Sequence, residues 1–597
     1  MQLRRFRLRF RRNIRKRQRQ ANDFSAVAED SLDRYIVRRL VRLLQVRRFL
    51  FGWIGLLLLV SFASVMQIRS LSSHHLVLAP SEGGILREGV VGTFTNANPL
   101  YAQTEVDLSV SKLVFAGLLK YNSSGILSPD LAEKYEVNSS ETEYTVYLKN
   151  DIKWHDGELV TAKDVVYTFQ TIQNPEAKSY LNSSWRGVTI SAPNDRTILF
   201  KLTSALSAFP HSLTTGILPE HILAKTSPAQ LRSSKFNNET LVGSGPFKFQ
   251  SIELDLKNQE VNSRLVLEPF SEYYEGPPKL ERFVIRAYQN ETTLNDAFKV
   301  NDVDTMVGLK TTPEDLDAEN SEIYRVSLSS QVMVFFKNDQ EVLKDPLIRK
   351  ALVLAVDKKE VLSQLGHPVL PIDEPLLRQQ IGYDKTFAQP SNMKKEASEI
   401  LDTLDWKRSS STGIRSKEGK PLKFKMLSAT NPEFTAVSAS IQKQWRDMGI
   451  EVEVNLQSDE DLQANVNTHN YDSLMYGISV GADPDVYAYW HGTQGDIRSE
   501  TRLNLSEYKS TIADKSLEAG RTRSDATNRA IKYRLFLEAW QKDYPALALY
   551  QQQFMYVAGN NLSGFNNKLM HTSSDRYADV HNWTIKKTPQ KIANTNN

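Results

Sequence analysis

The chain has 597 residues, which is enough for several domains with well-buried cores. Hydrophobic residues make up 40% of it and charged residues 24%, the balance of an ordinary globular protein. It contains no cysteine, which excludes disulfides, thiolate metal sites and attachment to a membrane through a lipid-bearing cysteine.

Positive charge is concentrated at the amino terminus. Residues 1–48 contain 16 Lys or Arg against 4 acidic residues, a net charge of +12, whereas the whole chain carries +4. The remaining residues therefore carry a net charge of −8. A basic segment of this kind binds nucleic acid or an anionic membrane surface, and the next stretch of sequence distinguishes the two.

Residues 49–68 form an uncharged run of 20 residues, about the length that crosses a hydrocarbon core as a helix. Because the basic excess precedes this run, we expect a single-pass anchor in the cytoplasmic membrane, with residues 1–48 inside and the body extracytoplasmic. The basic arm is expected to contact anionic lipids and no nucleic acid. Residues 32–48 fit either a basic amphipathic helix on the inner leaflet or an extension of the membrane helix. A cleaved signal peptide is the alternative, but its charged region would span 48 residues and no clear cleavage site follows.

The clearest local pattern in the body begins at residues 144–148. Apolar and polar residues alternate there, which predicts a half-buried strand. An Asp-Gly pair at 156–157 follows and predicts a turn. Thr161 with Asp164 three positions later is close to a capping box, so we expect a helix to begin at this point.

The residues around this predicted helix resemble a family signature. Trp-His-Asp-Gly at 154–157 and Thr-Ala-Lys-Asp-Val at 161–165 are similar to the signature of the family 5 extracellular solute-binding proteins, the dipeptide, oligopeptide and nickel receptors of ABC importers. Further segments resemble family motifs in the same order over roughly residues 85–585. They include Pro-Asp-Leu-Ala-Glu at 129–133, Ile-Leu-Pro-Glu-His-Ile at 217–222, Gly-Ser-Gly-Pro-Phe-Lys at 243–248, Tyr-Glu-Gly-Pro-Pro-Lys-Leu at 274–280 and Ala-Asp-Pro-Asp at 482–485.

The resemblance implies an α/β fold with two lobes, the periplasmic-binding-protein-like clam-shell of type II, large cluster C, after an N-terminal transmembrane helix. One lobe would contain residues 80–288 and 550–588 and the other residues 289–549, while residues 589–597 would form a disordered tail. The ligand would bind in the cleft between the lobes, which close by a hinge motion. The implied partners are a peptide or similar small solute, an ABC permease and its ATPase. We expect a monomer and no cofactor.

Ligand contacts are expected in the loop at residues 477–490. In peptide-binding members of the family, an acidic residue two or three positions before the Asp-Pro pair meets the ligand's amino terminus, since a desolvated ammonium group needs a charged partner. Val480 and Gly481 occupy that place here. Either Asp483 or Asp485 takes over the role, or the ligand is not a peptide with a free amino terminus. The predicted ligand-binding residues are Asn96, Asn98, Asp483, Asp485, Tyr487, Tyr489 and Trp490.

Asp483 also has a structural alternative, as the cap of a helix that begins at Pro484, a favoured first helical residue.

The chain contains no His-Glu-x-x-His, Gly-x-Ser-x-Gly or phosphate-binding-loop motif, and its ten histidines lack metal-ligand spacing. We therefore expect no catalysis and no metal site. The family resemblance implies capture of a solute for an ABC importer. The alternatives are a surface sensor or chaperone on the same fold, or an extracytoplasmic hydrolase, which turnover of the bound ligand would reveal.

Overall fold

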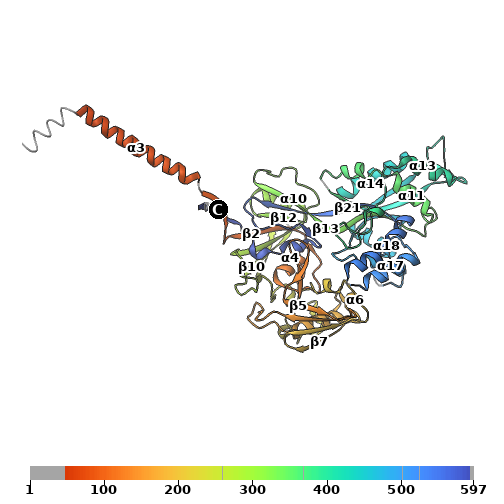
Figure 1. The fold of residues 1–597 in the computed structure, drawn as a ribbon, viewed down its shortest axis with the longest axis horizontal. Coiled ribbons are helices and arrows are strands. Elements are labelled where there is room, and N and C mark those ends of the chain that lie inside the picture. Colours follow the sequence, from red (N-terminus) through yellow and green to blue (C-terminus); the bar gives the residue numbers. More distant parts are fainter. Residues whose placement is uncertain are drawn as a thin grey trace, which may run out of the picture. The chain divides into compact units, whose positions relative to one another are not determined.

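The fold was analysed in a computed structural model of the chain (Figure 1). The structure describes residues 47–74, 76–257, 260–367, 369–499, 502–523 and 525–591. Residues 80–587 make up one compact unit, and residues 1–79 with 588–597 make up another. The predicted basic arm up to residue 46 and the predicted tail after residue 591 lie outside the described residues.

The smaller unit contains one long helix. α3 (Arg47–His74) has 28 residues and includes the whole predicted membrane segment 49–68. Large apolar side chains along it, such as Phe49, Leu58 and Met66, are exposed. A search of the described residues for a helix with the length and hydropathy of a membrane span found none.

A small two-stranded sheet lies mostly within the smaller unit. β1 (Leu76–Ser81) pairs with β23 (Lys586–Lys591). β23 ends at Lys591, and the rest of the predicted tail of residues 589–597 lies outside the described residues.

The larger unit is organised around a 12-stranded mixed sheet. Its two central strands, β13 (Ser321–Phe336) and β21 (Ala546–Gly559), are long antiparallel neighbours. The main path of the sheet runs β19-β18-β20-β13-β21-β12-β2-β11-β10-β9, with β14 added on β21 and β22 on β13. The bounds of the other strands are β2 (Ile85–Val91), β9 (Phe247–Lys257), β10 (Glu260–Pro269), β11 (Arg282–Tyr288), β12 (Thr305–Val307), β14 (Leu370–Pro371), β18 (Lys423–Ala429), β19 (Glu451–Gln457), β20 (Ser473–Ser479) and β22 (Leu569–Met570).

Two large hydrophobic cores lie along this sheet. The first core takes its residues mainly from 86–285 and 554–583, and the second from 332–550. Strands β13 and β21 contribute to both cores (Figure 1). Their pairing register shifts between Ser327 and Gln331, where β13 passes from one core to the other. A second register shift follows between Val332 and Met333, so the hydrogen-bond ladder is locally disrupted in this part of the strand pair.

The predicted strand and helix are confirmed in the first core. β6 (Glu143–Leu148) buries every second side chain and lies between β5 and β8 in a four-stranded sheet. α5 (Ala162–Gln173) follows Thr161, whose backbone N–H donates to the carboxylate of Asp164 at 2.8 Å. The other main elements of this region are α4 (Glu105–Val114), β3 (Leu119–Tyr121), β4 (Leu127–Pro129), β5 (Ala132–Val137), α6 (Asn182–Trp185), β7 (Thr189–Asn194), β8 (Thr197–Lys201), α7 (Phe209–Ser212) and η6 (Ser573–Tyr577).

Helices surround the second core (Figure 1). α14 begins after Asn431, whose side chain accepts from the N–H of Phe434, and Pro432 occupies its favoured first position. α17 and α18 pack against each other. The helices of this region are α11 (Pro346–Ala355), α12 (Lys358–Ser363), α13 (Lys394–Thr403), α14 (Pro432–Asp447), α15 (Asp459–Thr468), α16 (Tyr487–Trp490), α17 (Thr511–Arg521) and α18 (Ala526–Asp543), with α10 (Glu291–Lys299) on a small third core.

Candidate functional site

The loop that follows β20 contains most of the predicted ligand residues and is fixed to the central sheet. The backbone N–H groups of Val480 and Gly481 both donate to the carbonyl of Ser329 on β13, at 2.9 and 3.2 Å. α16 begins at Tyr487, so the helix expected to start at Pro484 is not present and needs no cap from the preceding residue.

Asp483 is held by an arginine of the second core. Arg529 on α18 donates to both of its carboxylate oxygens, at 2.7 and 2.6 Å, and the two side chains are only 10% and 3% exposed. One oxygen also accepts the backbone N–H of Asp485 at 2.9 Å. His211, from α7 beside the first core, lies 3.9 Å from the other oxygen. The negative charge of Asp483 is therefore already matched inside the protein.

Asp485 is paired in a similar way. Its carboxylate lies 3.0 Å from the guanidinium of Arg521, the last residue of α17, which also sits over the ring of Tyr487 at 4.1 Å from its centroid. Burial raises the pKa of Asp485, although Arg521 opposes this. The carbonyl of Arg521 accepts from the N–H and hydroxyl of Ser207, at 2.9 and 3.0 Å, which ties the end of α17 to the chain of the first core.

Two aromatic residues of α16 support the loop rather than line it. The hydroxyl of Tyr489 donates to the carbonyl of Ser479, and burial raises its pKa to about 12. The ring of Trp490 is fully buried, stacked on Phe335 and edge-on to Trp540 with centroids 5.7 Å apart in both cases. Tyr487 is the aromatic residue of α16 that lies against the paired charges, under the guanidinium of Arg521, and it is half-buried.

Asn96 and Asn98 stabilise the turn that leads into α4. Asn98 is fully buried, and its amide nitrogen and oxygen are bonded to Asn237 and to the N–H of Leu100, both at 3.0 Å. The amide oxygen of Asn96 accepts the N–H of Asn98 at 3.0 Å. A ligand contact from Asn96, which is half-buried, stays a prediction, whereas the polar groups of Asn98 are used within the turn.

Three ring side chains that the sequence analysis did not identify lie close together beside the loop that follows β20. The hydroxyl of Tyr121 lies 2.8 Å from Nδ1 of His211, and the ring of His571 lies 4.1 Å from that of Tyr121. Nε2 of His571 donates to the carbonyl of Gly125 at 2.7 Å, so its Nδ1 accepts from the hydroxyl of Ser329 at 2.6 Å. Burial lowers the pKa of His211. These residues are far apart in sequence, so no local motif could have identified them.

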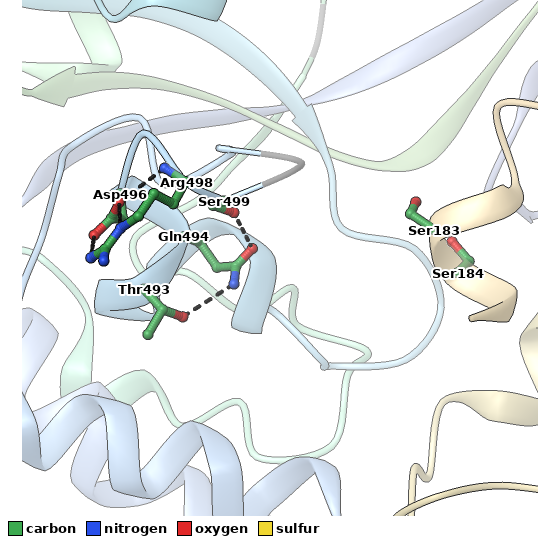
Figure 2. Close-up of a pocket in the computed structure, with 7 residues that line it drawn as sticks. All are labelled: Ser183, Ser184, Thr493, Gln494, Asp496, Arg498 and Ser499. Carbon is green, nitrogen blue, oxygen red and sulfur yellow. Dashed lines mark hydrogen bonds and ion pairs between the residues drawn. The ribbon is translucent and has the colours of Figure 1, made fainter. Parts of the chain in front are cut away.

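A cavity of about 560 Å³ lies between segments of the two cores (Figure 2). Ser183 and Ser184 of α6 border it on one side. The opposite side is formed by η5 (Gly492–Gly495) and the chain after it. The lining residues on this side are Thr493, Gln494, Asp496, Arg498 and Ser499, of which Asp496 and Arg498 form an ion pair with N–O distances of 2.9 and 2.6 Å. The cavity therefore offers hydroxyl and amide groups and a self-neutralised pair of charges.

A second cavity, of about 250 Å³, lies beside the turn that contains Asn98. Phe115, Tyr121 and Tyr180 give it aromatic walls, and Thr214 and Ser574 are among its hydroxyl groups. Its single basic lining residue is Lys112 of α4. Apolar walls with a few converging polar groups are typical of small-molecule sites.

The geometry of the described residues favours binding over bond-breaking chemistry. Ser329 and His571 have the composition of a nucleophile and its base, but Ser329 is only 1% exposed and His571 is oriented by a backbone carbonyl instead of a carboxylate. Among the described residues no group of three or more His, Asp or Glu side chains is arranged to hold a metal ion.

The sequence of the cavity-forming region identifies the family. Residues 127–499, more than half of the chain, match the bacterial extracellular solute-binding proteins, family 5, in their middle region. The chain belongs to this family. It is 26% identical over 521 residues to the oligopeptide-binding protein AppA of Bacillus subtilis, a match that covers 85% of this chain and 93% of AppA.

Solved structures of family 5 relatives have the same fold. NikZ from Campylobacter jejuni, solved in complex with Ni(L-His), superposes with a TM-score of 0.70 at 24% identity, covering 84% of this chain and 99% of NikZ. AppA from Bacillus subtilis, solved with a nonapeptide, superposes with a TM-score of 0.67 at 25% identity, covering 85% and 99%.

Family membership confirms two expectations drawn from the sequence motifs. The fold is the α/β periplasmic-binding-protein fold of cluster C. This family 5 protein is an extracytoplasmic solute-binding protein, and the family consists of binding proteins without enzymatic activity. The hydrolase alternative is thereby removed.

Proposed function

We propose that this family 5 protein is the membrane-anchored receptor of an ABC importer, which captures a peptide or similar small solute and delivers it to the permease. The observation that carries the proposal is the cavity of about 560 Å³, whose walls come from segments of both cores. The binding lobes would be residues 80–288 with 550–588, and residues 289–549. Closure of two lobes over a solute is the established way in which this fold traps its ligand.

Peptides are the first candidate class of solute. The oligopeptide-binding relative AppA matches nearly the whole body of this chain, and its structure holds a nonapeptide. A nickel complex is the second candidate, because NikZ binds Ni(L-His) on the same fold. The two candidates differ in chemistry, since a peptide needs backbone and terminal contacts, whereas a metal complex needs ligating or shape-matched side chains.

Titration of the detergent-purified full chain tests this function. We expect a pool of random tripeptides to raise its thermal midpoint, because a ligand that binds only the folded state stabilises it by mass action. Ni(II) with L-histidine, assayed in parallel, tests the second candidate. If neither raises the midpoint, capture of these solute classes is disproved. Cross-linking to a permease in membranes would separate an importer receptor from a surface sensor or chaperone.

The proposed membrane anchor, α3, leads to a separate prediction. α3 would span about 42 Å at 1.5 Å per residue, enough for a bilayer core, and its apolar side chains are exposed along residues 49–66. We expect protease added to spheroplasts to remove the body while an epitope on residues 1–48 stays protected. Release of the intact body into the medium would instead indicate a cleaved signal peptide.

A further inference from the structure

The charges of the loop that follows β20 cancel within the protein. Asp483 is bonded to Arg529 and Asp485 to Arg521. Val480 and Gly481, which precede these two aspartates, carry no charge. A ligand ammonium group at this loop would therefore find carboxylates that already have charged partners.

In the second cavity, by contrast, the basic side chain has no charged partner among the described residues. Lys112 is half-buried on its wall, and within the described part of the chain it makes no hydrogen bond or ion pair. The acidic residue of the same cavity, Asp575, uses one carboxylate oxygen to accept the backbone N–H groups of His571 and Thr572, at 3.0 and 2.9 Å. Lys112 is thus a half-buried cation that has no hydrogen-bonded or ion-paired partner among the described residues.

Stabilisation of the helix alone does not explain why Lys112 lies on the wall of a cavity. Lys112 is in the last turn of α4, where a cation interacts favourably with the helix dipole. That interaction is available to an ammonium group in open solvent. Here the side chain instead lines a cavity with Phe115, Tyr121 and Tyr180, where partial shielding from solvent strengthens its attraction to an anion.

We propose that Lys112 binds a carboxylate of the transported solute in the second cavity, so that the protein selects solutes by an acidic group and not by a free amino terminus. The inference rests on the proposed function. The two cavities lie on either side of one short segment, with Tyr180 and Leu181 lining the second and Ser183 and Ser184 lining the first.

Three tripeptide pools test the proposal on the detergent-purified full chain. One pool lacks Asp and Glu and has a free carboxyl terminus; the second has the same sequences with a carboxamide terminus; the third is amidated but carries one Asp or Glu. We expect the amidated pool without acidic residues to bind about 10- to 100-fold more weakly than at least one of the others, the size of a lost hydrogen bond to a charged group. The first and third pools distinguish a terminal carboxylate from an acidic side chain.

Variants assign the effect to Lys112. Lys112→Gln should remove the preference for acidic pools, Lys112→Arg should retain it, and Lys163→Gln, at an exposed position on α5, should leave it unchanged. Thermal midpoints of the ligand-free variants check that each is folded. Equal binding of all three pools by the unaltered chain, or a preference that survives in Lys112→Gln, overturns this inference alone. If no pool binds, and a free tripeptide pool of unrestricted sequence does not bind either, peptide capture itself is overturned.

Discussion

Replacing Asp483 with Asn is expected to lower the free energy of unfolding by about 3–5 kcal/mol. The reason is the guanidinium of Arg529, which is 3% exposed and would lose the charged partner that holds both of its terminal nitrogens. Breaking a buried pair on one side leaves an uncompensated charge in a poorly solvated place. The change would appear as a lower thermal midpoint of the ligand-free protein.

Two variants check this explanation. Asp483→Asn combined with Arg529→Met removes both charges and should recover much of the lost stability, because no unpaired ion remains buried. Asp496→Asn breaks an exposed pair with Arg498, which is 86% exposed, and should leave the thermal midpoint nearly unchanged because solvent screens such a pair. If Asp483→Asn keeps its thermal midpoint but loses affinity for tripeptides, Asp483 is a ligand partner and the internal pairing is secondary.

The pairing of Asp483 shows what the local sequence could and could not predict. Alternation at residues 144–148 and the Thr161–Asp164 spacing predict β6 and the start of α5, because the forces that form them act between residues close in sequence. Arg529 lies 46 residues from Asp483, and nothing in the pattern of α18 distinguishes it from a surface arginine. Partner choice across such separations is decided by tertiary packing.

The loop that follows β20 shows that local sequence can also mislead over a few residues. Asp483 followed by Pro484 is a good helix start by its composition, yet α16 begins at Tyr487. The carboxylate that would have capped the helix is engaged by Arg529 and by the N–H of Asp485. The family motifs locate this loop, but they do not reveal which of its charges are free.

The position of Lys112 in a cavity could not be predicted from the sequence, for a related reason. A lysine in the last turn of a helix is expected on the solvent side, where it interacts with the helix dipole. Its place in a cavity depends on residues near 180, 214 and 574, which come together only in the fold. The position of the Lys112 charge in the second cavity therefore follows from the tertiary structure.

Glu374 is the buried acid with the largest expected effect on pH dependence. It lies in the loop between β14 and η4 (Lys385–Phe387) and is 1% exposed. One carboxylate oxygen accepts a long bond of 3.4 Å from the N–H of Asp384, and the other has no hydrogen-bond partner among the described residues. Burial raises the pKa of Glu374 to about 8, and the charges of Asp384 and Asp373 add to the increase.

The raised pKa of Glu374 predicts a loss of stability as the pH rises. Below the ordinary Glu pKa of about 4.5 the group is protonated in both states, and its contribution to folding is fully present. Between that value and about 8 the unfolded chain releases the proton while the folded chain retains it, so this contribution declines and is lost above pH 8. Glu374→Gln, which carries no charge at any pH, should differ from the unaltered protein by less than about 1 kcal/mol at pH 5 and exceed its stability by about 2–4 kcal/mol at pH 8.5. Thermal midpoints at the two pH values measure the difference, with Glu319→Gln, at an exposed position, as the matched control. An equal effect of Glu374→Gln at both pH values would mean that Glu374 is ionised in the fold and has found a partner.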